Sequence, residues 1–161
     1  TTIRYDVTQK EDAYMVLLSL TEMVCMRLRE ENFLAGLISV SIKSNEFKSY
    51  SHQHKLSFQT DVTSTIYEEV KRLFDASWKN EPIRHLGVRL SNLKSKNFYQ
   101  YSLLDPQDIE KRRKLDKTID GIRFRYGNKS LIRASFIHSG FTPIQGGTVS
   151  DEDYPMMSSI L

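Results

Sequence analysis

The chain has 161 residues, of which 39% are hydrophobic, so it can bury one core without help from metals or disulfides. A single cysteine, Cys25, excludes an intrachain disulfide framework, and its apolar neighbours predict a buried thiol in a reducing compartment. The net charge of +3 is far below that of a histone-like protein. No apolar run approaches the roughly 18 residues that a membrane span needs, so we expect a cytoplasmic protein with no membrane partner.

The first part of the chain predicts a strand, a helix and a hairpin. Residues 1–7 suggest a strand, and because they open without a methionine we expect a piece of a longer protein. Apolar residues at spacings of three, four and seven predict an amphipathic helix over residues 12–33. Alternation over residues 37–43 predicts a strand, with its hairpin partner over residues 47–58. The buried side chains of the first hairpin strand are expected to be Ile38, Val40 and Ile42.

A second helix and a fourth strand follow. One apolar face predicts a helix over residues 63–78, with Thr65 and Glu68 at the spacing of an N-terminal capping box. Pro82 then precedes an alternating stretch over residues 83–93. The order strand, helix, strand, strand, helix, strand predicts an α+β fold, in which two helices cover one face of a four-stranded antiparallel or mixed sheet.

The rest of the chain is predicted to hold a linker, a helix and a tail. The main domain would cover residues 1–96, and a short apolar linker would cover residues 97–105. A C-terminal helix and a short strand are expected within residues 106–138, followed by an aperiodic tail over 139–161. The expected helix starts at Asp105 and Pro106, carries an apolar stripe and ends at Gly127. That stripe consists of Leu115, Ile119, Ile122 and Tyr126.

The face of the sheet opposite the helices is predicted to suit a polyanion. It would show short hydroxyls, a glycine and cations, without carboxylates. Cations release counterions from nucleic acid, and small side chains let a phosphate approach the backbone. An ordinary solvated face is the alternative on this pattern alone. The residues expected on this face are Ser39, Ser41, Lys43, His85, Gly87, Arg89 and Ser91.

The hairpin strand has no clean apolar side, which suits a sheet edge or a position against DNA. Its candidate contacts are Lys48, His52, His54 and Lys55. The sequence contains no nucleophile elbow, phosphate-binding glycine loop or zinc-ligand spacing. We therefore expect a binding module without catalytic or metal-ligating residues.

Five pieces of the sequence, in order, resemble the C-terminal region of Y-family translesion DNA polymerases, especially the bacterial UmuC/ImpB/MucB/SamB branch. They are "LTEMVCMRLREENFLAGLISVSI", the stretch 48–56, "RHLGVRLSNL", "QYSLLD" and "KRRKLDKTIDGIRFRYGNKSLIRAS". The resemblance implies a little-finger domain that lies along duplex DNA beside palm, fingers and thumb domains. The parent protein would be a DNA-directed DNA polymerase acting in translesion synthesis and DNA repair. Its Mg²⁺ would be held by palm carboxylates outside this chain, which itself would need no cofactor.

The resemblance also bears on single residues. Family members usually carry arginines in the hairpin strand where this sequence has Lys48, His52 and His54. The R-x-x-G-V pattern of the last strand is kept here as Arg84, Gly87 and Val88. The kept pattern implies phosphate contacts along the sheet, whereas histidines in place of two arginines imply a lower phosphate affinity at neutral pH.

A clamp-binding peptide is implied at the linker, because family members place there a glutamine, any residue, serine or aspartate, leucine and phenylalanine. Gln100, Ser102, Leu103 and Leu104 fit this pattern, with leucine in place of the phenylalanine. A glutamine amide and two adjacent apolar side chains suit pockets on a sliding clamp. The alternative for this segment is packing against its own domain.

The alternative for the whole chain is a stand-alone ferredoxin-like module that binds RNA or another protein. RNA-binding sheets of that shape stack bases on exposed aromatic side chains. The central strands predicted here expose none.

Overall fold

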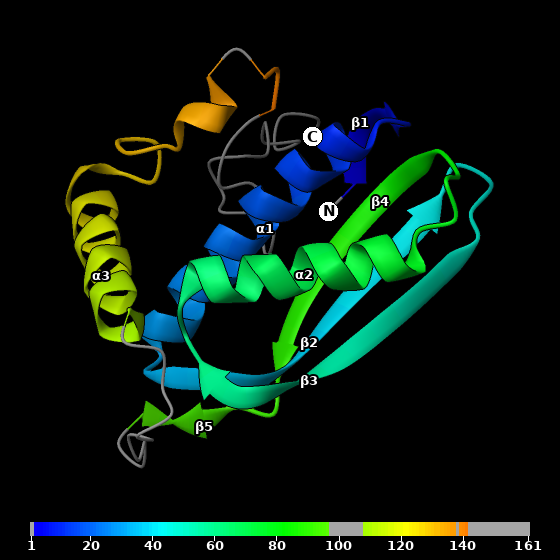
Figure 1. The fold of residues 1–161 in the computed structure, drawn as a ribbon. Helices are drawn as coiled ribbons and strands as arrows, with labels where there is room; N and C mark the ends of the chain where they lie inside the picture. Colours follow the sequence, from blue (N-terminus) through cyan, green and yellow to red (C-terminus); the bar gives the residue numbers. More distant parts are fainter. Residues whose placement is uncertain (1, 97–107, 138, 142–161) are drawn as a thin grey trace, which may run out of the picture.

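The computed structural model describes residues 2–96, 108–137 and 139–141 (Figure 1). Its strands are β1 (Thr2–Val7), β2 (Phe33–Ser44), β3 (Ser49–Thr60), β4 (Ile83–Ser91) and β5 (Lys94–Ser95). Its helices are α1 (Lys10–Glu30), α2 (Thr63–Ser77) and α3 (Ile109–Tyr126), followed by a 3-10 turn, Ala134–Phe136. Within the described part of the chain, no helix is long and apolar enough to cross a membrane.

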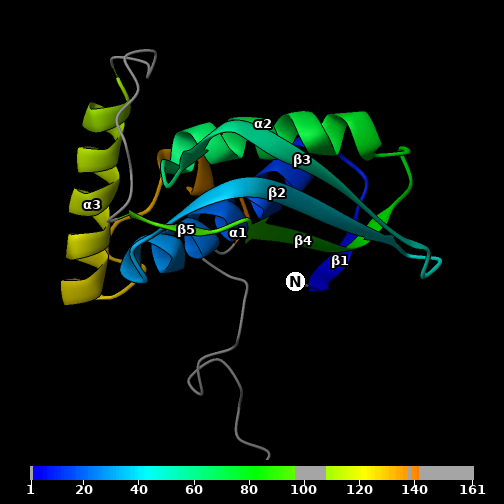
Figure 2. The same cartoon turned by 90° about the horizontal axis from the view of Figure 1, so that it is seen from below.

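The strands form one antiparallel sheet in the order β1-β4-β2-β3, and β5 pairs with the beginning of β2. Helices α1 and α2 both pack on one face of this sheet (Figure 1). This arrangement confirms the predicted α+β fold with two helices on one side. Helix α3 stands at one end of the sheet, beside β5 and far from the hairpin between β2 and β3 (Figure 2).

The hydrophobic core lies between the sheet and the two helices. The alternation predicted for β2 is confirmed, because Ile38, Val40 and Ile42 are buried against the helices. On α2, the fully buried Phe74 ring stacks on Trp78 with 5.4 Å between ring centroids. Each large apolar side chain removed from water in this way stabilises the fold by roughly 1.5–3 kcal/mol.

Cys25 belongs to this core and is completely buried. Burial raises the pKa of its thiol to about 12. Since the thiolate is the reactive form of cysteine, the thiol is inert in the folded protein. The prediction of a buried thiol is confirmed.

Helix α3 packs mainly through charged side chains, and the predicted apolar stripe is wrong in part, because Ile119 and Ile122 are only half-buried. Leu115 and Tyr126 are 59% and 66% exposed, whereas the buried residues of the helix are Ile109, Asp116 and Arg123. The helix ends at Gly127, as predicted, where φ is +94°. The proposed start at Asp105 and Pro106 lies outside the described residues.

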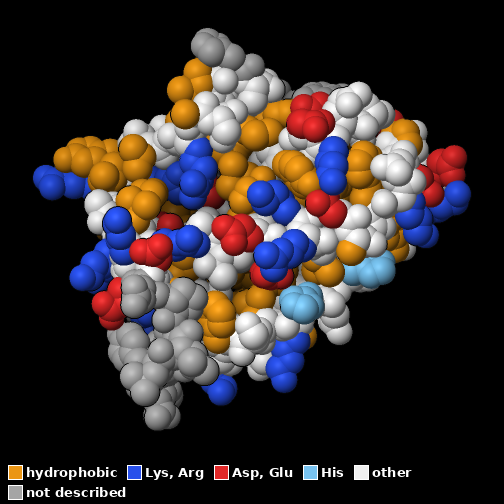
Figure 3. Space-filling view, in the orientation of Figure 1, with side chains coloured by type: hydrophobic (Ala, Val, Ile, Leu, Met, Phe, Trp, Pro, Cys, Tyr) orange, Lys and Arg blue, Asp and Glu red, His pale blue; other side chains and the backbone are white. Residues whose placement is uncertain are grey.

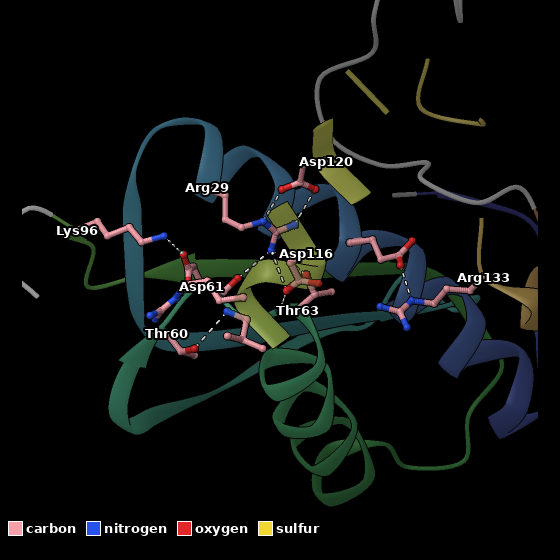
Figure 4. Close-up of polar contacts among 11 residues, drawn as sticks. Arg29, Thr60, Asp61, Thr63, Lys96, Asp116, Asp120 and Arg133 are labelled. Carbon is pink, nitrogen blue, oxygen red and sulfur yellow. Dashed lines mark hydrogen bonds and ion pairs between the residues drawn. The ribbon is translucent and has the colours of Figure 1, made fainter. Parts of the chain in front are cut away.

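Asp61, just after β3, joins three parts of the molecule (Figure 4). Its side chain is fully buried, and its two oxygens accept hydrogen bonds from Lys96 Nζ at 2.8 Å and Arg113 Nε at 2.7 Å. Burial alone would raise the pKa of the Asp61 carboxyl, but these two cations hold that pKa below its ordinary value of 3.8. The carboxylate therefore stays ionised and fixes α3 to the domain.

Arg29 of α1 makes a second connection to α3 (Figure 4). Its guanidinium donates to both carboxylate oxygens of Asp120, and its Nη1 also lies 3.4 Å from Asp116 Oδ2. A third connection is made by Glu22 of α1, which accepts hydrogen bonds from Arg123 and Arg133. Buried charges need such partners, because an unpaired one is strongly destabilising.

Two local predictions are corrected. Thr65 does not cap α2, because the helix begins at Thr63 and has no side-chain cap from its own segment. The short strand expected within 106–138 is absent from the described residues, which form the 3-10 turn instead. That segment buries Phe136 but leaves Leu131 and Ile132 partly exposed, so it lacks the alternation that a paired strand needs.

Candidate nucleic-acid interface

Three neighbouring strands place a grid of side chains on the face of the sheet that the described helices leave uncovered. We call this the open face. Residues opposite each other in a ladder share a face, so the register defines the grid. Its rows are Lys43 with His85 and Ser49; Ser41 with Gly87 and Ser51; Ser39 with Arg89 and Gln53; and Leu37 with Ser91 and Lys55.

The open face is positively charged. Its rows contain the cations Lys43, Lys55 and Arg89 and no carboxylate. Arg89 and Lys55 are exposed, and Lys43 is half-buried. Arg89 lies opposite Ser39, four residues along β2 from Lys43. The rows of Lys43 and Arg89 are therefore about 13 Å apart along the strands. This distance is close to four base-pair steps of a duplex.

The centre of the open face is built from small side chains. A Cβ atom at Gly87 would collide with the hydroxyl of Ser41, so glycine leaves the room that this serine occupies. The Ser39 hydroxyl donates a hydrogen bond of 3.4 Å to the backbone oxygen of His52. The centre of the grid therefore presents small side chains with hydroxyl groups, Lys43 and Lys55 lie in its two outer rows, and Arg89 lies in the row of Ser39.

His85 is mostly uncharged at neutral pH. Partial burial, together with the positive charge of Lys43, lowers the pKa of His85 below its ordinary value of 6.5. A phosphate bound beside it would favour the protonated ring, because an opposite charge stabilises the charged form.

The predicted DNA-contacting residues are divided by the structure. Ser39, Ser41, Lys43, Lys55, Arg89 and Ser91 lie together on the open face. His52 and His54 lie opposite Val40 and Ile38, so they share the face that the helices cover, although their own side chains are exposed on the edge strand. DNA contact by any of these residues stays a prediction.

The two remaining candidates lie away from the grid. Lys48 sits in the turn between β2 and β3, where it pairs with Glu46 at 2.7 Å. Arg84 lies 3.7 Å from Asp6 of β1, at a register irregularity of β4. Both cations therefore have an acidic neighbour, whereas no carboxylate shares a row of the grid with Lys43, Lys55 or Arg89.

Phe47, at the tip of the same turn, was missed by the sequence patterns, which placed it inside a strand. It is 75% exposed, and its backbone φ of +64° is rare for a bulky residue. Lys43 Nζ lies 4.9 Å from the centre of its ring. An exposed aromatic side chain on a strained turn beside the open face is a candidate contact.

Other expectations fall outside the grid. The predicted clamp-binding residues Gln100, Ser102, Leu103 and Leu104 lie outside the described residues. Among the residues that the structure does describe, no group of three or more His, Cys, Asp or Glu side chains is placed to hold a metal ion. The rows of the grid contain no Phe, Tyr or Trp on which an RNA base would stack.

Comparison with known proteins defines the class. Residues 1–103 match the model of the impB/mucB/samB family C-terminal domain, and the chain belongs to this family. The resemblance seen in the sequence is thus confirmed. Helix α3 lies beyond the matched residues.

The chain is similar to several curated bacterial proteins. It is 38% identical to DNA polymerase IV of Clostridium acetobutylicum over 83% of this chain and 34% of that protein. It is 39% identical to DNA polymerase IV 2 of Bacillus subtilis, over 75% and 30% of the two chains. It is 36% identical to the putative UV-damage repair protein UvrX of Bacillus subtilis, over 80% and 32%. The chain thus spans about a third of the length of these relatives.

A solved structure, the insertion ternary complex of Dbh DNA polymerase, is also similar. The TM-score is 0.44 and the sequence identity 16%, over 58% of this chain and 27% of that chain.

Proposed function

We propose that this chain is the DNA-contacting C-terminal domain of a bacterial Y-family polymerase that acts in translesion synthesis and DNA repair. In this proposal the open face lies along the backbone of the primer-template duplex. The observation that carries the proposal is the carboxylate-free grid with Lys43, Lys55 and Arg89. Family membership and similarity to proteins named DNA polymerase IV support it.

The contacts on the open face suit binding that does not depend on DNA sequence. Cations and short hydroxyls bind phosphate oxygens, which are the same at every base pair. The lack of exposed aromatic rings in the grid disfavours the alternative of an RNA-binding sheet. We therefore propose duplex DNA as the partner of this face.

The direct test is fluorescence anisotropy with two labelled duplexes of unrelated sequence. We expect similar affinities for both, and Arg89→Ala should weaken both to the same extent. Arg72→Ala is the matched control, because Arg72 is an exposed arginine on α2, on the covered side of the sheet. If the control weakens binding as much as Arg89→Ala, the open face is not the binding surface.

We also propose that the segment around Gln100 binds a sliding clamp. The support is the sequence pattern of Gln100, Ser102, Leu103 and Leu104, because an amide and two adjacent apolar side chains match such pockets. Lys96, which precedes this segment, and Arg113, on the helix that follows it, both bind Asp61.

The double variant Leu103→Ala, Leu104→Ala separates clamp binding from packing within the domain. We expect it to lose binding to the clamp while its urea-unfolding midpoint stays near that of the parent chain. Loss of such an anchor typically costs about 2 kcal/mol of binding energy or more. A large drop in the unfolding midpoint would show that the leucines pack inside the domain, and unchanged clamp binding would exclude the motif.

Nucleotide transfer is assigned to the rest of the parent protein. The metal-dependent chemistry of a polymerase needs clustered carboxylates, and the described residues supply no such cluster. We propose that the palm, fingers and thumb domains, with Mg²⁺, complete the enzyme, and that it acts on DNA in the cytoplasm.

A further inference from the structure

The outer surface of α3 is strongly basic because its acids are used for docking. Asp116 is buried, and Asp120 is bound by Arg29. Glu110 is the acidic residue of α3 whose side chain is exposed. The exposed cations of the helix are Lys111, Arg112, Lys114, Lys117 and Arg125. The packing of α3 thus concentrates positive charge on its free side.

A groove of about 790 Å³ runs between α3 and the C-terminal end of α1. Lys114 and Lys117 line it from α3, together with Phe124. Three acids, Glu30, Glu110 and Asp120, also line it, so the groove is not uniformly basic. Figure 3 shows hydrophobic side chains beside Lys and Arg side chains over α3.

Phe124 is the most unusual residue of this groove. It is 90% exposed, and no packing within the described fold explains a phenylalanine at this place. Phe124 shares the groove with Lys117 and Lys114, which lie about two and nearly three helical turns away along α3. Proteins bind single-stranded nucleic acid with aromatic rings and cations along one groove, because a ring stacks on a base while the cations contact phosphates. A duplex hides the faces of its bases and would leave the ring unused.

We propose that this groove binds single-stranded DNA, with Phe124 stacking on an unpaired base and Lys114 and Lys117 contacting phosphates. Lys96 also lines the groove, but its charge is bound to Asp61, so we assign it no phosphate. The site lies on a helix outside the residues that match the family domain and is separate from the open face. It does not depend on the function proposed for that face.

The test is anisotropy of a labelled short oligo-dT strand with the whole chain at low salt. Phe124→Ala should raise the Kd about tenfold, which is the effect of losing one stacked base. The double variant Lys114→Ala, Lys117→Ala should reduce the slope of log K against log salt by about 1.4. This is about 0.7 for each phosphate contact to a single strand.

Matched controls lie on the same helix. Leu115→Ala removes an exposed apolar side chain that does not line the groove, and Lys111→Ala removes an exposed cation that does not line it. Both should bind oligo-dT like the parent chain. Circular dichroism should show all variants folded, because the substituted side chains are exposed.

Three results would overturn the proposal. One is unchanged oligo-dT binding in both Phe124→Ala and the double lysine variant. Another is an equal loss in the Leu115 and Phe124 variants, which would indicate unspecific apolar contact or a protein-docking surface. The third is a loss confined to Arg89→Ala, which would place the single strand on the open face. Duplex binding and its loss in Arg89→Ala are measured separately. A negative result with oligo-dT would therefore not contradict the function proposed for the open face.

Discussion

The carboxylate of Asp116 on α3 accepts a hydrogen bond of 2.8 Å from the backbone N–H of Thr63, the first residue of α2. The start of α2 is thus capped from a helix far away in sequence. A helix N-terminus attracts negative charge, and its first N–H groups need acceptors. Burial raises the pKa of Asp116, although Arg29 and the Thr63 N–H oppose that shift. Helix α3 is therefore part of the folded domain.

Replacing Asp116 by alanine should lower the free energy of unfolding by about 2 kcal/mol, because α2 loses its cap and Arg29 loses one carboxylate. Urea unfolding measures this change. Asp116→Asn keeps an acceptor oxygen and should recover part of the loss. Thr65→Ala, at the position expected to cap the helix from sequence, should change stability by less than about 0.5 kcal/mol. The assignment of the cap fails if Thr65→Ala costs more than Asp116→Ala.

Asp61 should stabilise the fold in a way that depends on pH. Asp61→Asn removes the charge that binds Lys96 and Arg113, and we expect a loss of about 3 kcal/mol at pH 7. Because the folded-state pKa of Asp61 lies below 3.8, its contribution is complete above pH 3.8 and is lost as the pH falls through the folded-state value.

The free energies of unfolding of the two proteins should therefore converge below pH 3.8. Glu46→Gln is the control, since solvent screens the exposed pair of Glu46 and Lys48 and the difference should be small throughout. The role given to this carboxylate would be contradicted if the difference in free energy of unfolding between Asp61→Asn and the parent chain stayed constant from pH 7 to pH 3.

The strained backbone of Phe47 should lower the stability of the fold, while its ring should strengthen binding to duplex DNA. Phe47→Gly relieves the left-handed backbone and should leave the free energy of unfolding unchanged or raise it by up to about 1 kcal/mol, whereas Phe47→Ala keeps the strain. If the ring contacts DNA beside Lys43, both variants should bind duplex more weakly. Urea unfolding and anisotropy on the two variants decide this. A glycine variant less stable than the alanine variant would show that the turn is not strained.

The core elements could be predicted because their signal is hydrophobic periodicity. Ile38, Val40 and Ile42 alternate with polar residues, and burying one side of the strand follows directly. The same reasoning failed for α3, whose buried side chains are largely ion-paired. The packed face of α3 is marked in the sequence by charged residues at helical spacing, namely Arg113, Asp116, Asp120 and Arg123. Their partners on α1 and after β3 could not be known without the fold.

The candidate interface was predictable for the two central strands and less so for the hairpin. Ser39 and Arg89 follow from the alternation of β2 and β4. The faces of His52 and His54 depend on the register of β3, which the turn sets by placing Ser49 opposite Lys43. A shift by one residue moves every side chain to the other face, so the histidines could not be assigned from composition alone.

The salt dependence of duplex binding tests the central claim most directly. The observed affinity of the chain should fall steeply with salt, and Lys43→Ala and Arg89→Ala should each reduce the slope of log K against log salt by about 0.9, the value for one phosphate contact. Arg72→Ala should leave the slope unchanged. An affinity that does not depend on salt, or a slope unchanged in both the Lys43 and Arg89 variants, would contradict the assignment of the open face to DNA.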